Sequence, residues 1–342
     1  MEQLRCPYCK NTVESNLTGL HECFSRPLLQ RNCIIDFAKE DHYWNQIPRE
    51  EMSKLHDVAR TKGCKNALEE TLKKLKGEYT FNYAWDERRA DWYPLCELPE
   101  KPIIVDVGAG WGAVSTALAR QNGEVYSLDS NIETLEFIHI RSQENKFNNV
   151  KCIHVDPLEK TGFPFLDNSV DLVIMNGLLE WVGAAVDNGD PKRLQCEALK
   201  EASRILRPGG KLYIGIESRY GFSYWLGKED HPHTKFTSVV PRFVASLITK
   251  RKGLGPYRTY THSARQLKKM LLSSGFATAK FYVPFPEYRT PNRIIPLESA
   301  RALRKGIMHT GISRKHALFL FVASLLGLHK LFVDDYSIIS KK

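Results

Sequence analysis

From about residue 100 onward, short runs of aliphatic residues alternate with longer stretches in which apolar residues recur every three or four positions. This alternation predicts strands connected by helices, and therefore an α/β fold with a mostly parallel sheet. The predicted strands are 103–107, 124–129, 150–156, 170–175, 211–217, 280–283 and 336–340, and the predicted helices are 113–121, 132–145, 192–206 and 263–274. We therefore expect a seven-stranded sheet with helices on both faces.

The first hundred residues follow other patterns. Residues 1–50 hold a group of cysteines and predict a small ribbon-like module. Residues 51–98 have apolar residues at helical spacing, interleaved with aromatic residues, and predict a helical connector or lid. Residues 99–342 would then form the α/β domain, with basic insertions at about 219–262 and 287–333.

Charge is distributed unevenly along the 342 residues, whose formal net charge is +10. Residues 219–333 contain 20 Lys and Arg but only 4 Asp and Glu. Such a segment favours either an anionic partner or a solvated basic surface. No apolar run approaches the roughly 20 residues that span a bilayer, and the start, MEQLRCPYCK, lacks the apolar stretch of a secretory signal. We therefore expect a cytoplasmic protein.

The strongest chemical signal is a glycine-rich turn directly after the first predicted strand, in the stretch VDVGAGWG. Glycine allows a sharp turn and a close approach of the backbone to a ligand, and the amides that open the next helix face that ligand. Asp129 ends the second strand, where a carboxylate can accept both hydroxyls of a ribose. Asp156 and Pro157 end the third strand, and Asn176 and Gly177 the fourth. Parallel sheets bind ligands at these carboxyl ends.

Together with LKEASRILRPGGKLYIGIES before and along the fifth strand, these motifs resemble a class I S-adenosylmethionine-dependent methyltransferase over residues 100–218. The resemblance implies a Rossmann-like fold that ends on an antiparallel pair of strands, although here about 50 residues separate the two candidates. It implies that Asp106 faces the methionine amino group, that Asp129 binds the ribose and that Asp156 lies against the adenine. Asn176 would lie near the reacting methyl group. The implied cofactor-binding set is completed by Gly108, Ala109, Gly110, Gly112, Ser130, Pro157 and Gly177.

The amino-terminal cysteines resemble a partly degenerate zinc ribbon of the kind that precedes some bacterial methyltransferase domains. Cys6 and Cys9 form one C-x-x-C pair and Cys23 begins a second, but Arg26 stands where its partner would be. His21 or Cys33 can supply the fourth ligand of a tetrahedral structural zinc site, and we take the set Cys6, Cys9, Cys23 and Cys33. The alternative is a ribbon without zinc, packed by its apolar residues.

Candidate catalytic residues lie in loops that follow the fourth and fifth strands. An oxygen or nitrogen acceptor of a methyl group can need a base, which is often histidine or a carboxylate. Glu180 follows the fourth strand, Glu217 ends the fifth, and an acidic loop then carries His231 and His233. We take His233, His231 and Glu180 as the catalytic candidates. The alternatives are that the histidines are solvated loop residues and that Glu180 caps the adjacent helix or holds the cofactor.

The basic insertions suggest how the acceptor and other partners are bound. Arg219, Arg258, Tyr260 and Arg289 are candidates for an acceptor site that takes an anionic group, because Arg pairs with phosphate and stacks on aromatic rings. Ordinary loop packing is the alternative. The apolar stretch 317–328, which follows Arg314 and Lys315, predicts either a buried core helix or a helix lying on an anionic membrane.

The function that these patterns favour is methyl transfer from S-adenosylmethionine to oxygen or nitrogen of a small molecule, a sugar or a lipid-linked glycan. An RNA or protein methyltransferase is the first alternative. The basic segment supports RNA, although no known RNA-binding motif is present. A non-catalytic, cofactor-binding partner subunit is the second alternative.

Overall fold

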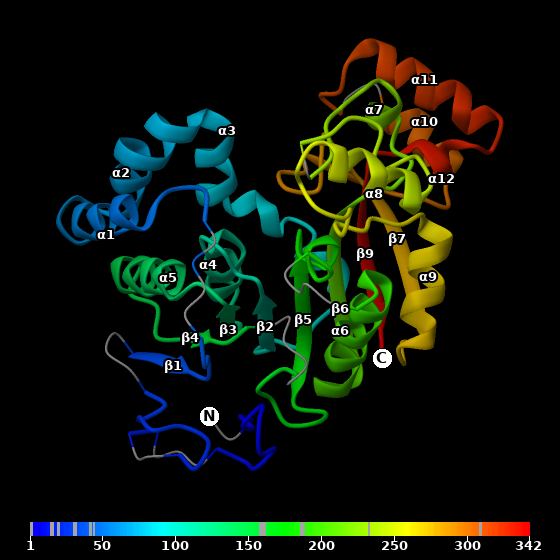
Figure 1. Ribbon diagram of the computed structural model, residues 1–342. Coiled ribbons are helices and arrows are strands. Elements are labelled where there is room, and N and C mark those ends of the chain that lie inside the picture. The colour runs from blue at the N-terminus through cyan, green and yellow to red at the C-terminus, as the bar shows by residue number, and fades with distance from the viewer. Residues whose placement is uncertain are drawn as a thin grey trace. The chain divides into compact units, whose positions relative to one another are not determined.

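The computed structural model describes residues 3–13, 17–18, 21–29, 33–40, 43, 45–156, 162–184, 189–231, 233–307 and 310–342 (Figure 1). The chain divides into two compact units. Unit 1 comprises residues 1–174 and 204–210, and unit 2 comprises residues 175–203 and 211–342. The domain boundaries expected near residues 50 and 98 both fall inside unit 1 and stay predictions.

The strands form a nine-stranded sheet in the order β1-β4-β3-β2-β5-β6-β9-β7-β8. Their bounds are β1 Ile34–Asp36, β2 Ile103–Val107, β3 Glu124–Asp129, β4 Val150–His154, β5 Val170–Asn176, β6 Leu206–Glu217, β7 Thr278–Phe285, β8 Arg293–Pro296 and β9 Asp335–Lys341. The neighbouring pairs among β1, β4, β3, β2 and β5 are parallel, whereas β6–β9, β9–β7 and β7–β8 are antiparallel. The mostly parallel α/β fold is therefore confirmed.

The sheet has two more strands than the seven expected, and one strand is longer. β1 comes from the region predicted as a ribbon, where Ile34 pairs with Cys152 of β4. β8 pairs with β7 through a four-residue segment that contains a proline. β6 starts at Leu206, whereas the sequence predicted a helix stop at Pro208 and a strand only from residue 211. The last strand, β9, forms as expected and pairs antiparallel with both β6 and β7.

In unit 1, helices cover the strands in two successive layers. Their bounds are α1 Arg49–Lys62, α2 Cys64–Leu68, α3 Lys74–Trp85, α4 Ala113–Arg120 and α5 Ile132–Glu144. Leu55 of α1 and Leu68 of α2 pack with Phe137 of α5, so α1–α3 form a layer outside α5 (Figure 1). The fully buried Arg141 of α5 donates to the carbonyls of Ala84 and Trp85, which removes the cost of an unpaired buried cation.

In unit 2, long connections between the antiparallel strands carry most of the helices. Their bounds are α6 Pro191–Ile205, α7 Phe222–Trp225, α8 Arg242–Arg251, α9 Ala264–Ser273, α10 Ala300–Gly306, α11 Arg314–Leu325 and α12 His329–Phe332. A capping box at Ser263 and Gln266 starts α9, as the sequence predicted for a helix at 263. In the described part of the chain, no helix combines the length and apolarity needed to cross a bilayer.

Candidate active site

The glycine-rich turn after β2 is built by hydrogen bonds to the end of β3. The amides of Gly108 and Ala109 both donate to the carbonyl of Leu128, at 2.8 and 3.0 Å. The amide of Gly110 donates to the Asp129 carboxylate at 2.8 Å, and the amide of Asn131 donates to its other oxygen at 3.0 Å. The loop and the carboxylate therefore hold one another in place before any ligand binds.

Gly110 and Gly112 of this turn are required for different structural reasons. Gly110 and Gly112 have φ of +52° and +75°, in the region that side chains disfavour. At Gly112 an added Cβ would lie 2.6 Å from Ile138 Cγ1, so this glycine allows α4 to approach α5. At Gly110 the nearest atom to an added Cβ is the Tyr83 hydroxyl, 4.0 Å away, so the space over this glycine is open enough for a ligand to approach the backbone.

Asp106 is buried one residue before the end of β2. The Ser115 hydroxyl donates to its carboxylate at 2.7 Å, and the Ser127 hydroxyl donates to Ser115 at 2.8 Å. Burial raises the pKa of Asp106 to about 6, with the Ser115 bond and the charge of Arg89 acting in the opposite direction. A carboxylate in this state is stabilised by any cationic group that comes close, such as the amino group of an amino acid.

The end of β4 links Asp129 and its loop to the amino-terminal segment. The imidazole of His154 lies with Nδ1 2.9 Å from the Asp36 carboxylate and Nε2 3.2 Å from the Ser130 carbonyl. Arg26 pairs with Asp36 and donates to the carbonyl of Ala38 at 2.6 Å. Asp156 follows β4 and is partly buried. Pro157 lies outside the described residues.

In unit 2, the end of β5 carries an unusual buried amide. Asn176 is 7% exposed, and neither polar atom of its side chain has a hydrogen-bond partner among the described residues. Gly215 of β6 makes room for it, since a Cβ there would lie 2.3 Å from Asn176 Oδ1. Gly177 follows with φ +74°, and its amide donates to the Gly215 carbonyl at 2.8 Å. Native proteins seldom leave such an amide unpaired, and a polar group of a bound ligand would satisfy it.

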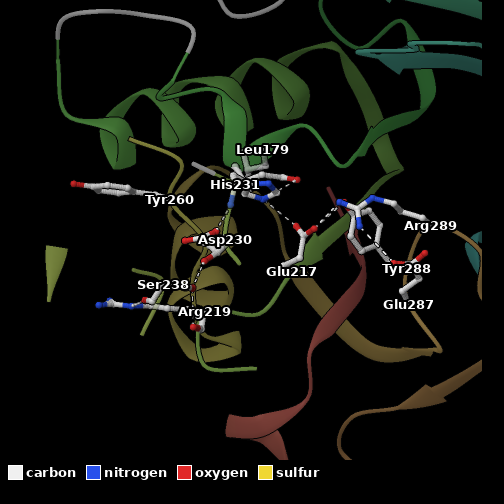
Figure 2. Close-up of polar contacts among 12 residues, drawn as sticks. Leu179, Glu217, Arg219, Asp230, His231, Ser238, Tyr260, Glu287, Tyr288 and Arg289 are labelled. Carbon is white, nitrogen blue, oxygen red and sulfur yellow. Dashed lines mark hydrogen bonds and ion pairs between the residues drawn. The ribbon is translucent and has the colours of Figure 1, made fainter. Parts of the chain in front are cut away.

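Unit 2 also gathers two glutamates and one histidine that are far apart in sequence. His231 Nε2 lies 3.4 Å from a Glu217 oxygen and 4.0 Å from a Glu180 oxygen. The other Glu217 oxygen accepts a hydrogen bond from Arg289 at 2.6 Å, as Figure 2 shows. The Trp181 ring packs on His231 with centroids 4.6 Å apart. We call Glu180, Glu217, His231 and Arg289 the acid–histidine cluster.

Burial and mutual charge set the protonation of this cluster. Burial and the charge of Glu217 raise the pKa of Glu180 to about 8. Burial opposes the ionised form of Glu217 as well, but Arg289 and His231 outweigh it and hold that pKa well below its usual range. Burial alone would lower the pKa of His231, yet Glu217 and Glu180 raise it to about 9. These influences favour the ionised form of Glu217 and the imidazolium form of His231, and they disfavour ionisation of Glu180.

Glu180 stands out because it is fully buried and unsatisfied. Its side chain is 0% exposed, and within the described residues neither carboxylate oxygen meets a hydrogen-bond donor. Leaving a buried carboxyl unpaired is costly in free energy. A ligand that offers an N–H or O–H group would satisfy it.

The remaining candidates lie elsewhere. The His233 side chain is 90% exposed, and its nearest acid is Glu229 at 3.9 Å, so the structure does not bring it into the cluster. Arg219 donates to the carbonyls of Ser238 and Val240, and Arg258 to those of Gly183 and Gly189. Tyr260 stacks on Tyr257 and lies under Arg242. These contacts fit loop packing, and only Arg289 of the four acceptor-site candidates belongs to the cluster.

In the sequence, Glu217 is one of the carboxylates considered as a base at the end of a strand, but it is not among the three catalytic candidates chosen. Its position resembles that of Asp129, a carboxylate at the carboxyl end of a strand, and that signal could have found it. Tyr288, whose hydroxyl lies 3.4 Å from Glu217, had no such signal because it comes from the loop after β7.

The amino-terminal cysteines form a second site, in unit 1. Cys6, Cys9, His21 and Cys23 each offer a ligand atom, and these atoms all lie within 4.8 Å of one another. Cys6 and Cys9 flank a tight turn in which the Lys10 amide donates to the Cys6 carbonyl at 3.1 Å. Cys33 is not part of this group: it is exposed and directly precedes β1, whose pairing with β4 fixes its place. The structure therefore groups His21, and not Cys33, with Cys6, Cys9 and Cys23.

Comparison with known proteins bears on the central part of the chain. Residues 105–214 match the family of methyltransferase domains. A 37.1 kDa protein of a Streptomyces fradiae transposon is 27% identical over 176 residues, which are 51% of this chain and 43% of that protein. The ubiquinone biosynthesis O-methyltransferase of Coxiella burnetii is 26% identical over 160 residues, 46% of this chain and 57% of that enzyme. The chain thus spans about half the length of these relatives.

Among solved structures, phosphoethanolamine N-methyltransferase 2 of Haemonchus contortus, in complex with S-adenosylhomocysteine, is similar at 15% identity and a TM-score of 0.45. The similarity covers 84% of this chain and 59% of that one. The family match includes the glycine-rich turn, Asp129 and β5. The chain therefore contains a class I S-adenosylmethionine-dependent methyltransferase domain.

Proposed function

We propose that the protein transfers a methyl group from S-adenosylmethionine to an oxygen or nitrogen atom of a small molecule, a sugar or a lipid-linked glycan. Unit 1 would bind the cofactor and unit 2 would bind and activate the acceptor. The observation that carries the proposal is the unsatisfied, fully buried Glu180 beside His231, in a chain whose glycine-rich turn is complete.

The residues of unit 1 suit the cofactor. The Asp129 carboxylate stands ready for ribose hydroxyls, Asp106 for the methionine amino group, and the open space over Gly110 for close approach of the ligand. When bound, the cofactor supplies a methyl group that is already activated on a sulfonium. The protein then has to bind the acceptor, orient it and accept its proton.

Glu180 is our candidate for the proton acceptor. Its pKa of about 8 lies close to a working pH, where a general base is most effective. His231 would act as its cationic partner, held in place by Glu217, which Arg289 fixes in turn. Only the ionised form of Glu180 can accept a proton, and the positive charge on His231 would stabilise that form. An acceptor O–H or N–H would then donate its proton to a Glu180 oxygen.

The burial of the acid–histidine cluster favours a small acceptor group. Glu180 and Glu217 are 0% and 3% exposed, so an acceptor atom that meets them must leave bulk water. A small molecule or the end of a glycan chain can do this more easily than the surface of a folded RNA or protein. Of the arginine candidates only Arg289 lies in the cluster, so an anionic group on the acceptor would share Arg289 with Glu217.

We also propose that Cys6, Cys9, His21 and Cys23 bind a structural zinc ion. Three thiolates and one imidazole are a common ligand set of structural zinc sites, whose ligand atoms lie within about 4 Å of one another. Such a site would order a segment with little apolar core of its own.

The first experiment is titration calorimetry of the full chain with S-adenosylhomocysteine. We expect binding that Asp129→Ala weakens at least about tenfold, because ribose hydroxyls lose a charged acceptor. Asp57→Ala, which removes an exposed carboxylate of α1, should bind like the parent, and NAD should not bind. If the parent does not bind S-adenosylhomocysteine, the alternative that the protein is a non-catalytic subunit that depends on a partner would be favoured.

A second experiment identifies the acceptor class. Label from methyl-labelled S-adenosylmethionine is followed into the small-molecule, lipid, RNA and protein fractions of a bacterial extract. We expect label in the first two fractions and its loss with Glu180→Gln. Label in RNA or protein alone would replace the proposed acceptor, and binding without transfer to any fraction would favour a non-catalytic protein.

A further inference from the structure

Helix α11 presents an apolar stripe to solvent. Leu318, Val322 and Leu325 are 64%, 47% and 61% exposed, and their spacing places them on one side of the helix. Ala317, Leu320 and Ala323 on the other side are buried. The sequence left open whether this stretch is a core helix or a surface helix, and the structure shows a helix with one side packed and an apolar side exposed.

Two other helices of unit 2 repeat this feature. In α8, Phe243 and Leu247 are 70% and 54% exposed and lie one turn apart, while Ala245 and Thr249 are buried. At the end of α7, Trp225 and Leu226 are 51% and 71% exposed. α7 packs on α11 through Phe222 and Phe319, whose rings stack with centroids 3.8 Å apart. We call the exposed apolar side chains of α7, α8 and α11 the apolar face.

These helices gather at one end of unit 2, away from the chain's carboxyl terminus (Figure 1). Most of the large apolar side chains that the structure describes as exposed lie in this part of the chain. Scattered exposed leucines are ordinary, but protruding aliphatic and aromatic side chains on α11 and on α7, which packs against it, mark an interaction surface, and α8 adds further exposed apolar side chains.

Basic residues accompany the apolar face. Arg314 and Lys315 are exposed at the start of α11, one turn before Leu318. Lys250, Arg251 and Lys252 are exposed at the end of α8. Interfaces between proteins are depleted in Lys, whereas a bilayer that contains anionic lipids attracts exposed Lys and Arg and accepts apolar side chains beneath them. Charge complementarity therefore favours an anionic membrane as the occupant.

We propose that the apolar face docks unit 2 on the surface of a membrane that contains anionic lipids. Leu318, Val322 and Leu325 would enter the boundary between headgroups and acyl chains, and Arg314 and Lys315 would lie among the lipid phosphates. α11 would lie in the plane of the membrane, since its 12 residues are too few to cross a bilayer.

Flotation of the full chain with lipid vesicles tests the proposal. Vesicles of phosphatidylcholine with one quarter phosphatidylglycerol are compared with vesicles of phosphatidylcholine alone. We expect binding to the anionic vesicles that weakens with added salt and is at least about tenfold weaker for Leu318→Asp/Leu325→Asp. Leu272→Asp, on the 46% exposed leucine of α9, should bind like the parent.

Three results would overturn the proposal. The protein could fail to float with anionic vesicles at low salt, or the double variant could float as well as the parent. The parent could also sediment as a dimer that Leu318→Asp/Leu325→Asp converts to monomer, without any vesicle binding, which would assign the face to a second copy of the chain. Circular dichroism and S-adenosylhomocysteine binding of each variant show that loss of flotation is not loss of fold.

Discussion

At the scale of single residues, the acid–histidine cluster shows how one ion pair sets the charge of its neighbours. Glu217 keeps its negative charge because Arg289 and His231 both lie against it. The Glu217 charge raises the pKa of both His231 and Glu180, which favours the charged form of the histidine and disfavours the charged form of the glutamate. It stabilises the imidazolium and destabilises the second carboxylate.

This arrangement predicts the effect of Glu217→Gln on His231. Glu217→Gln removes the carboxylate charge that lies 3.4 Å from His231 Nε2, while Glu180 and Asp230 still favour the imidazolium and burial still disfavours it. The pKa of His231 should therefore fall from its value of about 9. Histidine side-chain NMR over pH 5–10 measures this, with His231→Asn assigning the resonance. Glu229→Gln, which changes an exposed carboxylate of the same loop, should leave the titration unchanged. An unchanged His231 titration in Glu217→Gln would contradict the proposed role of Glu217.

The sequence pointed to several of the acidic residues at these sites, but it did not show which residues pair with one another. Glu180, Glu217 and Asp129 were visible because polar residues after buried strands stand out. The pairing of Glu217 with Arg289 was not visible, because 71 residues lie between them and only the antiparallel strands of unit 2 bring them together. Arg219 and Arg258 have the same composition signal as Arg289, but they donate to backbone carbonyls, and no local pattern separates the two uses.

At the scale of elements, β1 connects the amino-terminal segment to the loop that holds Asp129. Asp36 ends β1 and pairs with His154 at the end of β4, and His154 also reaches the Ser130 carbonyl. Ser130 directly follows Asp129. The position of Asp129 thus depends on a contact that begins 93 residues earlier in the chain.

We therefore predict that His154→Ala weakens S-adenosylhomocysteine binding about three- to tenfold, because two hydrogen bonds that position the Ser130 loop are lost. Calorimetry measures the change. His139→Ala, a partly buried histidine of α5, is the matched control and should bind like the parent. Equal affinity of His154→Ala and the parent would mean that the contact supports the fold without positioning Asp129.

Element prediction succeeded where periodicity was long enough. The seven expected strands and the helices α4, α5, α6 and α9 form within a few residues of their predicted bounds. β1 and β8 are three and four residues long, too short for a period of two to be recognised, and both depend on a partner strand for their conformation. β6 extends back through Pro208 and two glycines, and its register with β9 starts only at Lys211, the residue where the sequence predicted the strand to begin.

At the scale of the whole molecule, cysteines and basic residues are concentrated in different parts of the sequence, and in the structure these parts belong to different units. The glycine-rich turn and the cysteine group belong to unit 1, whereas the acid–histidine cluster and the basic, apolar helices belong to unit 2. This separation allows each proposed role to be tested by changes in one unit, with the other unit as an internal control.

The proposed zinc site gives the sharpest such test. Metal analysis of protein purified without a His tag should find about one zinc per chain. His21→Asn and Cys9→Ser should reduce this below about 0.2, because a structural site with three ligands binds far more weakly. Cys33→Ser is the matched control and should keep its zinc, since Cys33 is exposed and outside the group.

The fourth zinc ligand is His21 in the proposed set and Cys33 in the set expected from the sequence. These two sets predict opposite zinc contents for His21→Asn and Cys33→Ser. If His21→Asn keeps its zinc and Cys33→Ser loses it, the four cysteines expected from spacing are the ligands, and Cys33 must leave its place before β1 to reach the ion. Because Asp36 lies on that strand, zinc binding would then alter the contact with His154, and metal removal would change S-adenosylhomocysteine affinity. With His21 as the ligand β1 stays paired, and chelation should lower the unfolding temperature of unit 1 while leaving the His231 titration in unit 2 unchanged.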